Sequence, residues 1–207
     1  MRHFLLIILW VVFYACHTRT ARKPIVALQP MSFDSVEQID SVRSVLERYY
    51  GFTVVVLDNT NLPESTFINV KSPRYRADKL LKYLQTIKPD TCDYIMGLTT
   101  EDISTTKWES NGKVKQPASR YLDWGIFGLG YRPGDASIIS THRLGKNPEV
   151  KLDRLQKICM HELGHNLGLP HCETYMCVMS DAAESIKTID NEAKSLCSKC
   201  QSLAARD

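Results

Sequence analysis

His161-Glu162-Leu163-Gly164-His165-Asn166-Leu167-Gly168-Leu169-Pro170-His171 is the stretch of sequence that decides what this chain folds into and what chemistry it can carry. If this stretch begins as a helix, His161 and His165 lie one turn apart on the same face, so two imidazoles can bind one metal ion. Glu162 can then reach a water on that metal without being a ligand. Gly168 tolerates the left-handed conformation that ends a helix, and the reversed chain returns His171 as a third ligand. Three protein ligands leave a fourth position for water, which is the arrangement of a catalytic zinc site.

A second group of residues follows the histidines at short, regular intervals. A pair of histidines on a helix is often ordinary packing, but a third histidine where the geometry requires it favours the metal site. Four thiolates in two close pairs suit a closed, tetrahedral structural zinc site. The spacing is also compatible with a local disulfide between Cys197 and Cys200, and with a Met179 that only packs in the core. The residues concerned are Cys172, Cys177, Met179, Cys197 and Cys200.

The combined pattern from Met160 to Cys200 resembles the archaemetzincin family of zinc metallopeptidases, which belongs to the metzincin clan, and it matches that family at every defining position. The resemblance implies two zinc ions in each chain, one catalytic and one structural. Some metzincins carry a switchable tyrosine ligand two residues after the methionine, but Asp181 stands there, so that role is not expected. The implied assignments are His161, His165 and His171 as catalytic zinc ligands, Cys172, Cys177, Cys197 and Cys200 as structural zinc ligands, and Met179 as the residue of the turn beneath the catalytic zinc.

These residues predict hydrolysis of a peptide bond by water. Zinc on neutral imidazoles lowers the pKa of its water and polarises the scissile carbonyl. Glu162 accepts the proton of that water as general base and passes it to the leaving amine. No covalent nucleophile is needed, and the sequence shows no Ser-His-Asp or Cys-His arrangement. The alternative is a zinc-stabilised binding protein of the same fold with negligible turnover, and the presence of Glu162 favours the peptidase.

Length and composition predict one compact domain over residues 24–207. The chain has 207 residues, of which 43% are hydrophobic, so it can bury a substantial core. It carries 26 basic and 23 acidic residues, a net charge of +3, and shows no basic stripe with interleaved aromatic residues. A nucleic-acid partner is therefore not expected. The expected partner is a peptide or protein substrate of a monomeric enzyme.

The N-terminus predicts export. The apolar run from Phe4 to Ala15 is shorter than the roughly 20 residues that a membrane-spanning helix needs, but it fits the core of a secretory signal. Because Cys16 follows directly, residues 1–16 resemble a bacterial lipoprotein signal with Cys16 as the lipidated first residue, although Phe13 departs from the usual Leu. We therefore expect a membrane-anchored lipoprotein on the periplasmic or cell-surface face. A plain cleaved signal, giving a secreted soluble protein, and an uncleaved anchor are the alternatives.

The pattern of the remaining chain predicts an α+β fold with an α/β-like order of elements. Alternating and continuous apolar stretches predict strands, and apolar residues three and four apart predict helices. A long polar stretch, 100–120, reads as an irregular loop, and 181–195 reads as a final helix that carries Cys197 and Cys200 into place. The expected strands are 25–28, 53–57, 94–98, 125–130 and 136–140, and the other expected helices are 35–50, 76–86 and 152–167.

The resemblance also implies an architecture, the metzincin-type domain. It combines a mixed, twisted sheet and backing helices with an active-site helix and a small C-terminal subdomain that the structural zinc holds together. One edge strand of such a sheet binds substrate by strand addition. Gly125 to Gly130, expected to form a hairpin with Ala136 to Ser140, is the candidate edge, and the alternative is an ordinary core strand.

Overall fold

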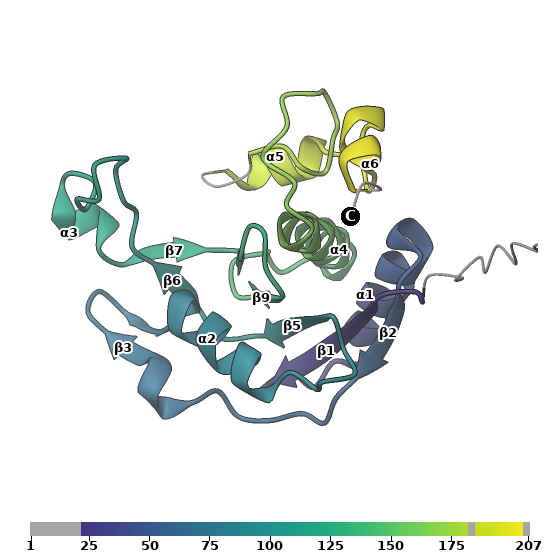
Figure 1. The fold of residues 1–207 in the computed structure, drawn as a ribbon. Coiled ribbons are helices and arrows are strands. Elements are labelled where there is room, and N and C mark those ends of the chain that lie inside the picture. Colours follow the sequence, from purple (N-terminus) through teal and green to yellow (C-terminus); the bar gives the residue numbers. More distant parts are fainter. Residues whose placement is uncertain (1–21, 182–184, 205–207) are drawn as a thin grey trace, which may run out of the picture.

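The computed structural model describes residues 22–181 and 185–204. The expected signal segment and Cys16 lie outside the described residues. Within the described part, no helix has both the length and the apolar character needed to cross a membrane. The arrangement is α+β, as the sequence predicts, with mixed sheets and backing helices (Figure 1). A cysteine cluster lies near the C-terminus.

The main sheet has five strands in the order β2-β1-β5-β9-β8. The four strands from β2 to β9 are parallel, and β8 pairs antiparallel with β9 at one edge. Each strand expected in this sheet is present, with ends shifted by a few residues. The bounds are β1 (Ile25–Met31), β2 (Thr53–Val56), β5 (Tyr94–Thr99), β8 (Gly128–Gly130) and β9 (Ala136–Ser140).

Helices cover both faces of the main sheet and form two apolar cores. Side chains alternate along a strand, so Val26 and Leu28 of β1 join the core under α1 (Val36–Tyr50) and α4 (Pro148–Asn166). Ala27 faces the opposite core, under α2 (Ala77–Ile87). All three helices were expected from their apolar spacing. The packing in these two cores fixes the sheet between the helices, and the sheet in turn supports α4.

Local signals in the sequence set the ends of α1. The Ser35 hydroxyl accepts a hydrogen bond from the Gln38 backbone N–H and caps the first turn. Gly51 ends the helix in the left-handed conformation at φ 69° and donates its N–H to the Glu47 carbonyl. Both ends therefore follow from residues that the sequence shows directly.

A second, smaller sheet corrects the expectation of an irregular loop over 100–120. The order of this sheet is β3-β4-β6-β7; β6 lies within that stretch, and the short helix α3 begins in it and ends one residue beyond it. Short strands of three or four residues carry too little periodicity to be recognised. The bounds are β3 (Phe67–Asn69), β4 (Pro73–Arg76), β6 (Ile103–Thr105), β7 (Trp124–Ile126) and α3 (Ala118–Tyr121), with one 3-10 turn, η1 (Glu64–Thr66).

The stretch from Gly125 to Gly130 is two strands rather than one. β7 pairs antiparallel with β6 in the small sheet, whereas β8 forms the expected hairpin pairing with β9. Phe127 separates the two strands, and its carbonyl accepts a hydrogen bond from the Ser140 N–H at 2.9 Å. This segment therefore links the two sheets, and its second half forms the edge of the main sheet.

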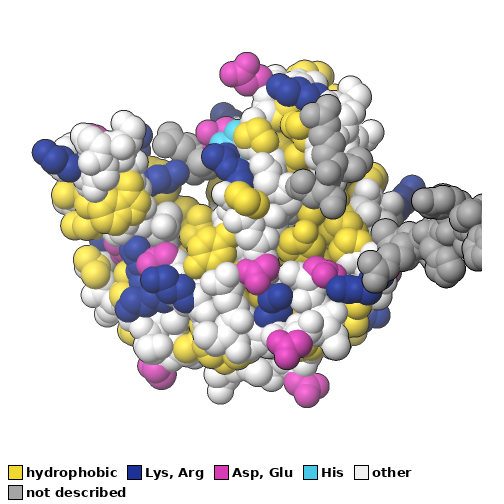
Figure 2. Space-filling model, in the orientation of Figure 1, with side chains coloured by type: hydrophobic (Ala, Val, Ile, Leu, Met, Phe, Trp, Pro, Cys, Tyr) yellow, Lys and Arg dark blue, Asp and Glu magenta, His cyan; other side chains and the backbone are white. Residues whose placement is uncertain are grey.

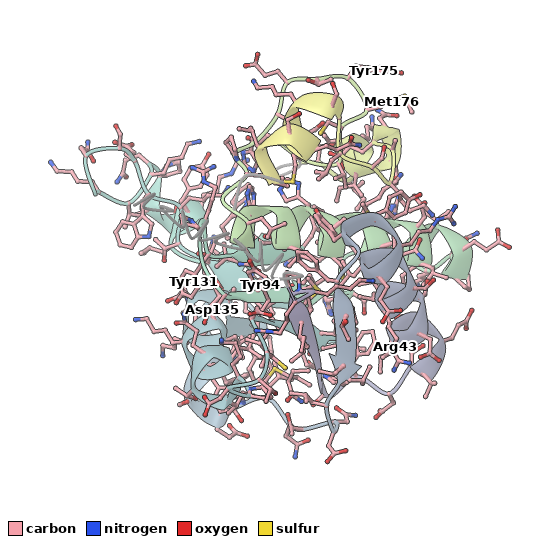
Figure 3. The ribbon with its side chains drawn as sticks, turned by 45° about the vertical axis from the view of Figure 1, so that its right-hand side comes forward. Arg43, Tyr94, Tyr131, Asp135, Tyr175 and Met176 are labelled. Atoms are coloured by element: carbon pink, nitrogen blue, oxygen red, sulfur yellow. The ribbon has the colours of Figure 1, made fainter. Side chains whose placement is uncertain are left out.

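The C-terminal part also differs from expectation. The single helix expected over 181–195 is the short α5 (Ile186–Asn191), and a second helix, α6 (Ser198–Ala204), carries Cys200. Figure 1 shows both helices on the side of α4 that faces away from the main sheet. The loop from 173 to 176 projects from this subdomain, with Tyr175 and Met176 at its tip (Figure 3). The four cysteines pack together with apolar side chains of α5 and α6 in one core cluster.

We expect the contact between α1 and α4 to contribute measurably to stability. The half-buried Tyr50 donates a hydrogen bond of 2.7 Å through its hydroxyl to the Met160 carbonyl of α4. Tyr50→Phe should lower the free energy of unfolding by about 1 kcal/mol, because it removes one hydrogen bond between the two helices. Tyr49→Phe is the matched control, since Tyr49 is 45% exposed. Denaturant unfolding of the two variants should differ, and an equal loss in both would contradict this role.

Candidate functional site

The helix α4 ends at Asn166, directly after His165, so the chain can reverse and bring His171 toward the other two histidines. Gly168 adopts φ 84° and donates its N–H to the His165 carbonyl at 2.8 Å, while the Leu169 N–H bonds to the Gly164 carbonyl at 3.0 Å. A residue with a Cβ is strained in that conformation, so glycine permits the reversal. The chain then runs without helix to His171, which returns beside the last turn of α4.

The three imidazoles converge on one point. One ring nitrogen each from His161, His165 and His171 lie within 4.8 Å of one another, and the Nε2 atoms of His165 and His171 are 3.2 Å apart. Zinc–nitrogen bonds of about 2.0–2.1 Å in a tetrahedron place two ligand nitrogens about 3.3 Å apart. The donor set and its spacing therefore fit a zinc ion.

Hydrogen bonds orient the rings for this purpose. His161 Nδ1 lies 2.8 Å from the Val178 carbonyl, and His165 Nδ1 lies 2.8 Å from the Leu169 carbonyl. A carbonyl can only accept, so each Nδ1 carries the hydrogen and each Nε2 keeps its lone pair for a metal. His171 Nδ1 lies 3.5 Å from the Asp181 carboxylate. Asp181, two residues after Met179, therefore faces the third histidine.

Burial keeps the rings of His161 and His165 neutral. It lowers the pKa of His161 to about 3, with the neighbouring His165 acting in the same direction. The pKa of His165 is also lowered, first by burial. A histidine must be neutral to bind zinc, so lowered pKa values favour the ligand form at neutral pH.

Glu162 lies between these rings and the edge strand β8. Burial raises the pKa of its carboxyl to about 8, and a hydrogen bond from the Gly130 backbone acts in the opposite direction. Space for this side chain depends on glycine, since a Cβ at Gly128 would lie 2.7 Å from Glu162 Oε1 and one at Gly130 would lie 2.9 Å from the Glu162 carbonyl oxygen. A positive ion beside the carboxyl would lower its pKa and favour the ionised form.

The four cysteines form a second cluster. Cys172 and Cys197 have their sulfurs 3.7 Å apart, those of Cys177 and Cys200 are 3.8 Å apart, and all four lie within 4.8 Å of one another. None of the six cysteines in the described part of the chain is in a disulfide, so the local bridge is not formed. Zinc–sulfur bonds of about 2.3 Å in a tetrahedron place two sulfurs about 3.8 Å apart. The cluster therefore fits a zinc ion with no open position.

Met179 lies in a turn beneath α4. Its side chain is fully buried, and a Cβ added at Gly164 would collide with its sulfur. The Met179 carbonyl accepts a hydrogen bond of 2.8 Å from the Cys172 N–H. The turn therefore connects the backbone next to His171 with the underside of the helix that carries His161 and His165.

A cavity of about 410 Å³ opens onto the histidines and Glu162. In the space-filling view a recess separates the projecting lobe of β6, β7 and α3 from the C-terminal subdomain, and histidine surface is visible beside it (Figure 2). The lining comes from both sides of this recess, that is, from β6 to β8 on one side and from α4 and α5 on the other. A chain-like ligand could therefore lie across the three histidines.

Comparison with known proteins agrees with this geometry. The model of Peptidase family M54 matches residues 24–206. The chain belongs to this family. The archaemetzincin of Methanopyrus kandleri is 31% identical over 170 residues, which are 82% of this chain and 87% of that protein.

Solved archaemetzincin structures share the fold. The crystal structure from Methanopyrus kandleri superposes with a TM-score of 0.72 at 28% identity, over 91% of this chain and 97% of that one. The crystal structure from Archaeoglobus fulgidus gives a TM-score of 0.69 at 23% identity, over 86% of this chain and 99% of that one, and it supports the fold alone. The chain is thus an archaemetzincin-family zinc metallopeptidase.

The sequence located both clusters of this chain but missed the residue that holds the neighbouring turn. Asn166 donates through its side-chain nitrogen to the carbonyls of Tyr131 and Ala136, at 3.0 and 2.9 Å. It thereby fixes the turn after β8, where Tyr131 and Asp135 lie close together (Figure 3). The only signal for this role in the sequence was the presence of Asn166 inside the histidine motif.

Glycine at position 128 should be needed for turnover rather than for metal binding. Gly128→Ala places a methyl group against Glu162 Oε1, so the carboxyl must move while the histidines stay. A displacement of about 1 Å can cost roughly 100-fold in rate, and we expect a fall of that order in kcat/KM with unchanged zinc content. Gly112→Ala is the control, because that glycine lies at φ 76° with no atom within 4 Å of an added Cβ. It should affect stability only, and parent-like turnover of Gly128→Ala would contradict the packing argument.

Proposed function

We propose that this chain hydrolyses peptide bonds with a zinc ion held by His161, His165 and His171 and with Glu162 as general base. The observation that carries the proposal is the position of the Glu162 carboxyl, which lies against β8 and lines the same cavity as the three histidines. A group that takes a proton from attacking water must lie within hydrogen-bond reach of the reacting atoms. Glu162 meets this condition for a substrate that lies along β8.

The edge strand supplies the binding surface for that substrate. β8 is the last strand of the main sheet, and its neighbours Phe127 and Tyr131 bond to β9 through the Phe127 carbonyl and the Tyr131 N–H. Antiparallel strands alternate the direction of their backbone groups, so Gly128 and Gly130 direct theirs away from β9. An extended peptide can pair with Gly128 by strand addition. The scissile bond of that peptide would then lie next to Glu162.

The chemistry divides between the metal and this carboxylate. Zinc bound by the three imidazoles supplies a Lewis acid that polarises the scissile carbonyl and lowers the pKa of water. Glu162 accepts the proton of the attacking water and delivers it to the nitrogen of the leaving amine. The hydrogen bond from the Gly130 backbone holds the carboxyl toward the cavity. The reaction needs no covalent nucleophile.

We assign a second, structural zinc to the four cysteines, which gives two ions in each chain. Their sulfur separations fit a tetrahedral ion, and the cluster joins the loop after His171 to α6. Met179 then acts as the turn residue that supports the histidine site from below. The residues proposed for this zinc are Cys172, Cys177, Cys197 and Cys200.

We also propose that the chain is exported as a lipoprotein. The support is the apolar run that ends directly before Cys16, which has the length of a signal core. A lipid on Cys16 would place the catalytic domain beside a membrane surface outside the cytoplasm. A single acyl chain binds only marginally, so more than one is expected on a stably anchored protein.

Glu162→Gln should separate an enzyme from a zinc-holding binding protein. The substitution removes the proton acceptor without removing a ligand, so turnover should fall by about 10²–10⁴-fold while zinc content stays the same. Glu149→Gln, at the exposed start of the same helix, is the control and should leave turnover unchanged. A fully metallated Glu162→Gln protein that cleaves peptides at the parent rate would disprove the general-base role.

Metal analysis should find two zinc ions per chain. Cys200→Ser should lower the content toward one ion and reduce thermal stability, because three thiolates bind less tightly than four, while the histidine site remains loaded. Cys92→Ala is the control, since this buried cysteine lies outside the cluster. A parent protein with one zinc and a bridge between Cys197 and Cys200 would contradict the assignment.

Cys16→Ser should release the protein from membranes or block its processing. The parent should partition into the membrane fraction and into detergent, and mass spectrometry should find a lipid on its first residue. A soluble parent that begins downstream of Cys16 would refute lipidation while leaving export intact.

A further inference from the structure

The lining of the active-site cavity includes an acidic side chain that the mechanism does not use. This carboxylate belongs to Glu192, the residue that follows α5, and it lines the same cavity as His161 and Glu162. Apolar side chains from β7, from the link to β8, from α4 and from α5 also line this cavity. These wall residues are Ile126, Phe127, Ile158 and Ile189.

Glu192 is buried without a partner for one of its oxygens. The residue is only 7% exposed, and within the described chain Glu192 Oε1 has no hydrogen-bond donor in reach. Burying a carboxyl oxygen in this state costs stability, so the position of this group in a cavity calls for an explanation. Burial raises the pKa of this carboxyl to about 8, and the nearby Lys157 acts against that rise.

Lys157 forms no ion pair with this carboxyl, because its ammonium is engaged elsewhere. Lys157 Nζ lies 2.7 Å from Asp153 Oδ2 and donates to the Ile189 carbonyl at 3.0 Å. Two further cations line the cavity, Lys107 and Arg132; Arg132 is exposed and Lys107 is partly exposed. Solvent screens such charges more strongly than a buried group. Glu192 Oε1 therefore lacks a hydrogen-bond donor, and a donor with positive charge would complement it.

We propose that Glu192 is a specificity residue that selects a lysine or arginine side chain next to the scissile bond. This inference rests on the peptidase function proposed above. The aliphatic stem of such a side chain would lie against the apolar walls, and its charged end would meet Glu192. Because Glu192 lines the same cavity as His161 and Glu162, the selected side chain belongs to a residue close to the bond that is cut.

The first test compares peptides that differ only in charge. Zinc-loaded protein is given matched peptides with lysine, norleucine or glutamate at each position beside the cut, and mass spectrometry locates the cleavage. The parent should prefer lysine over norleucine in kcat/KM by roughly 10-fold or more, the range in which a buried charged partner contributes to selectivity. Glu192→Gln should abolish this ratio while cleaving the norleucine peptide at least as well.

Two controls separate specificity from structural damage. Glu192→Met keeps the volume without the carboxyl and should lose the ratio in the same way, so it carries the test where the Gln variant does not fold. Glu149→Gln removes an exposed carboxylate on α4, outside the cavity lining, and should keep the preference. A preference for glutamate, or a lysine preference that survives both Glu192 variants, would overturn the proposal.

A binding measurement distinguishes failure of this inference from failure of the peptidase function. Zinc-loaded Glu162→Gln protein should bind the lysine peptide roughly 10-fold tighter than the norleucine peptide, and adding Glu192→Gln should remove the difference. A parent that cleaves no peptide, combined with this binding preference, would refute the peptidase function alone. Cleavage without any preference for lysine or arginine would refute the role of Glu192 alone.

Discussion

The structure depends on the covalent link between His171 and Cys172, which makes the third histidine of one cluster the direct neighbour of the first cysteine of the other. The histidine approaches His165 only after a chain reversal, and no helix holds it in place. The segment that follows is fixed by backbone bonds, since the Cys172 N–H bonds to the Met179 carbonyl and the Val178 carbonyl faces His161 Nδ1. An ion bound by the cysteines would therefore reduce the freedom of the third histidine.

Burial of the site has opposite consequences for its ligands and its carboxyl. It favours neutral His161, which is the form that binds metal, but it also favours neutral Glu162, which cannot accept a proton. A divalent ion among the histidines reverses the second effect, because its charge stabilises the carboxylate. In the proposed mechanism, a bound metal would therefore favour the ionised carboxylate that a general base needs. The glycines of β8 permit the close approach that this coupling requires.

The sequence predicts the site better than it predicts the sheets. The histidines and cysteines are local features whose spacing is imposed by a helix, a turn and a tetrahedral ion, so both clusters form where expected. The long helix α4 and the helices α1 and α2 follow equally from apolar periodicity. The small sheet escaped prediction because its strands have three or four residues and are defined by partners far along the chain. The C-terminal helices were misjudged because α5 has only six residues.

Residues that act through long-range contacts could not be recognised from the sequence at all. Glu192 reads as one more surface acid until the fold brings it to the cavity that Glu162 also lines. Asn166 reads as a variable position within the histidine motif, although it fixes the turn after β8. The glycines of β8 are expected in a strand, but the sequence does not show that Glu162 packs against them. In each case the decisive partner lies on another element.

Anomalous diffraction from crystals at the zinc absorption edge tests the central claim most directly. The account predicts two peaks, one within about 2.0–2.1 Å of three histidine Nε2 atoms and one within about 2.3 Å of four cysteine sulfurs. The first should have a free coordination position directed toward Glu162. A single peak, or cysteine sulfurs joined in disulfides at about 2.05 Å, would contradict the account.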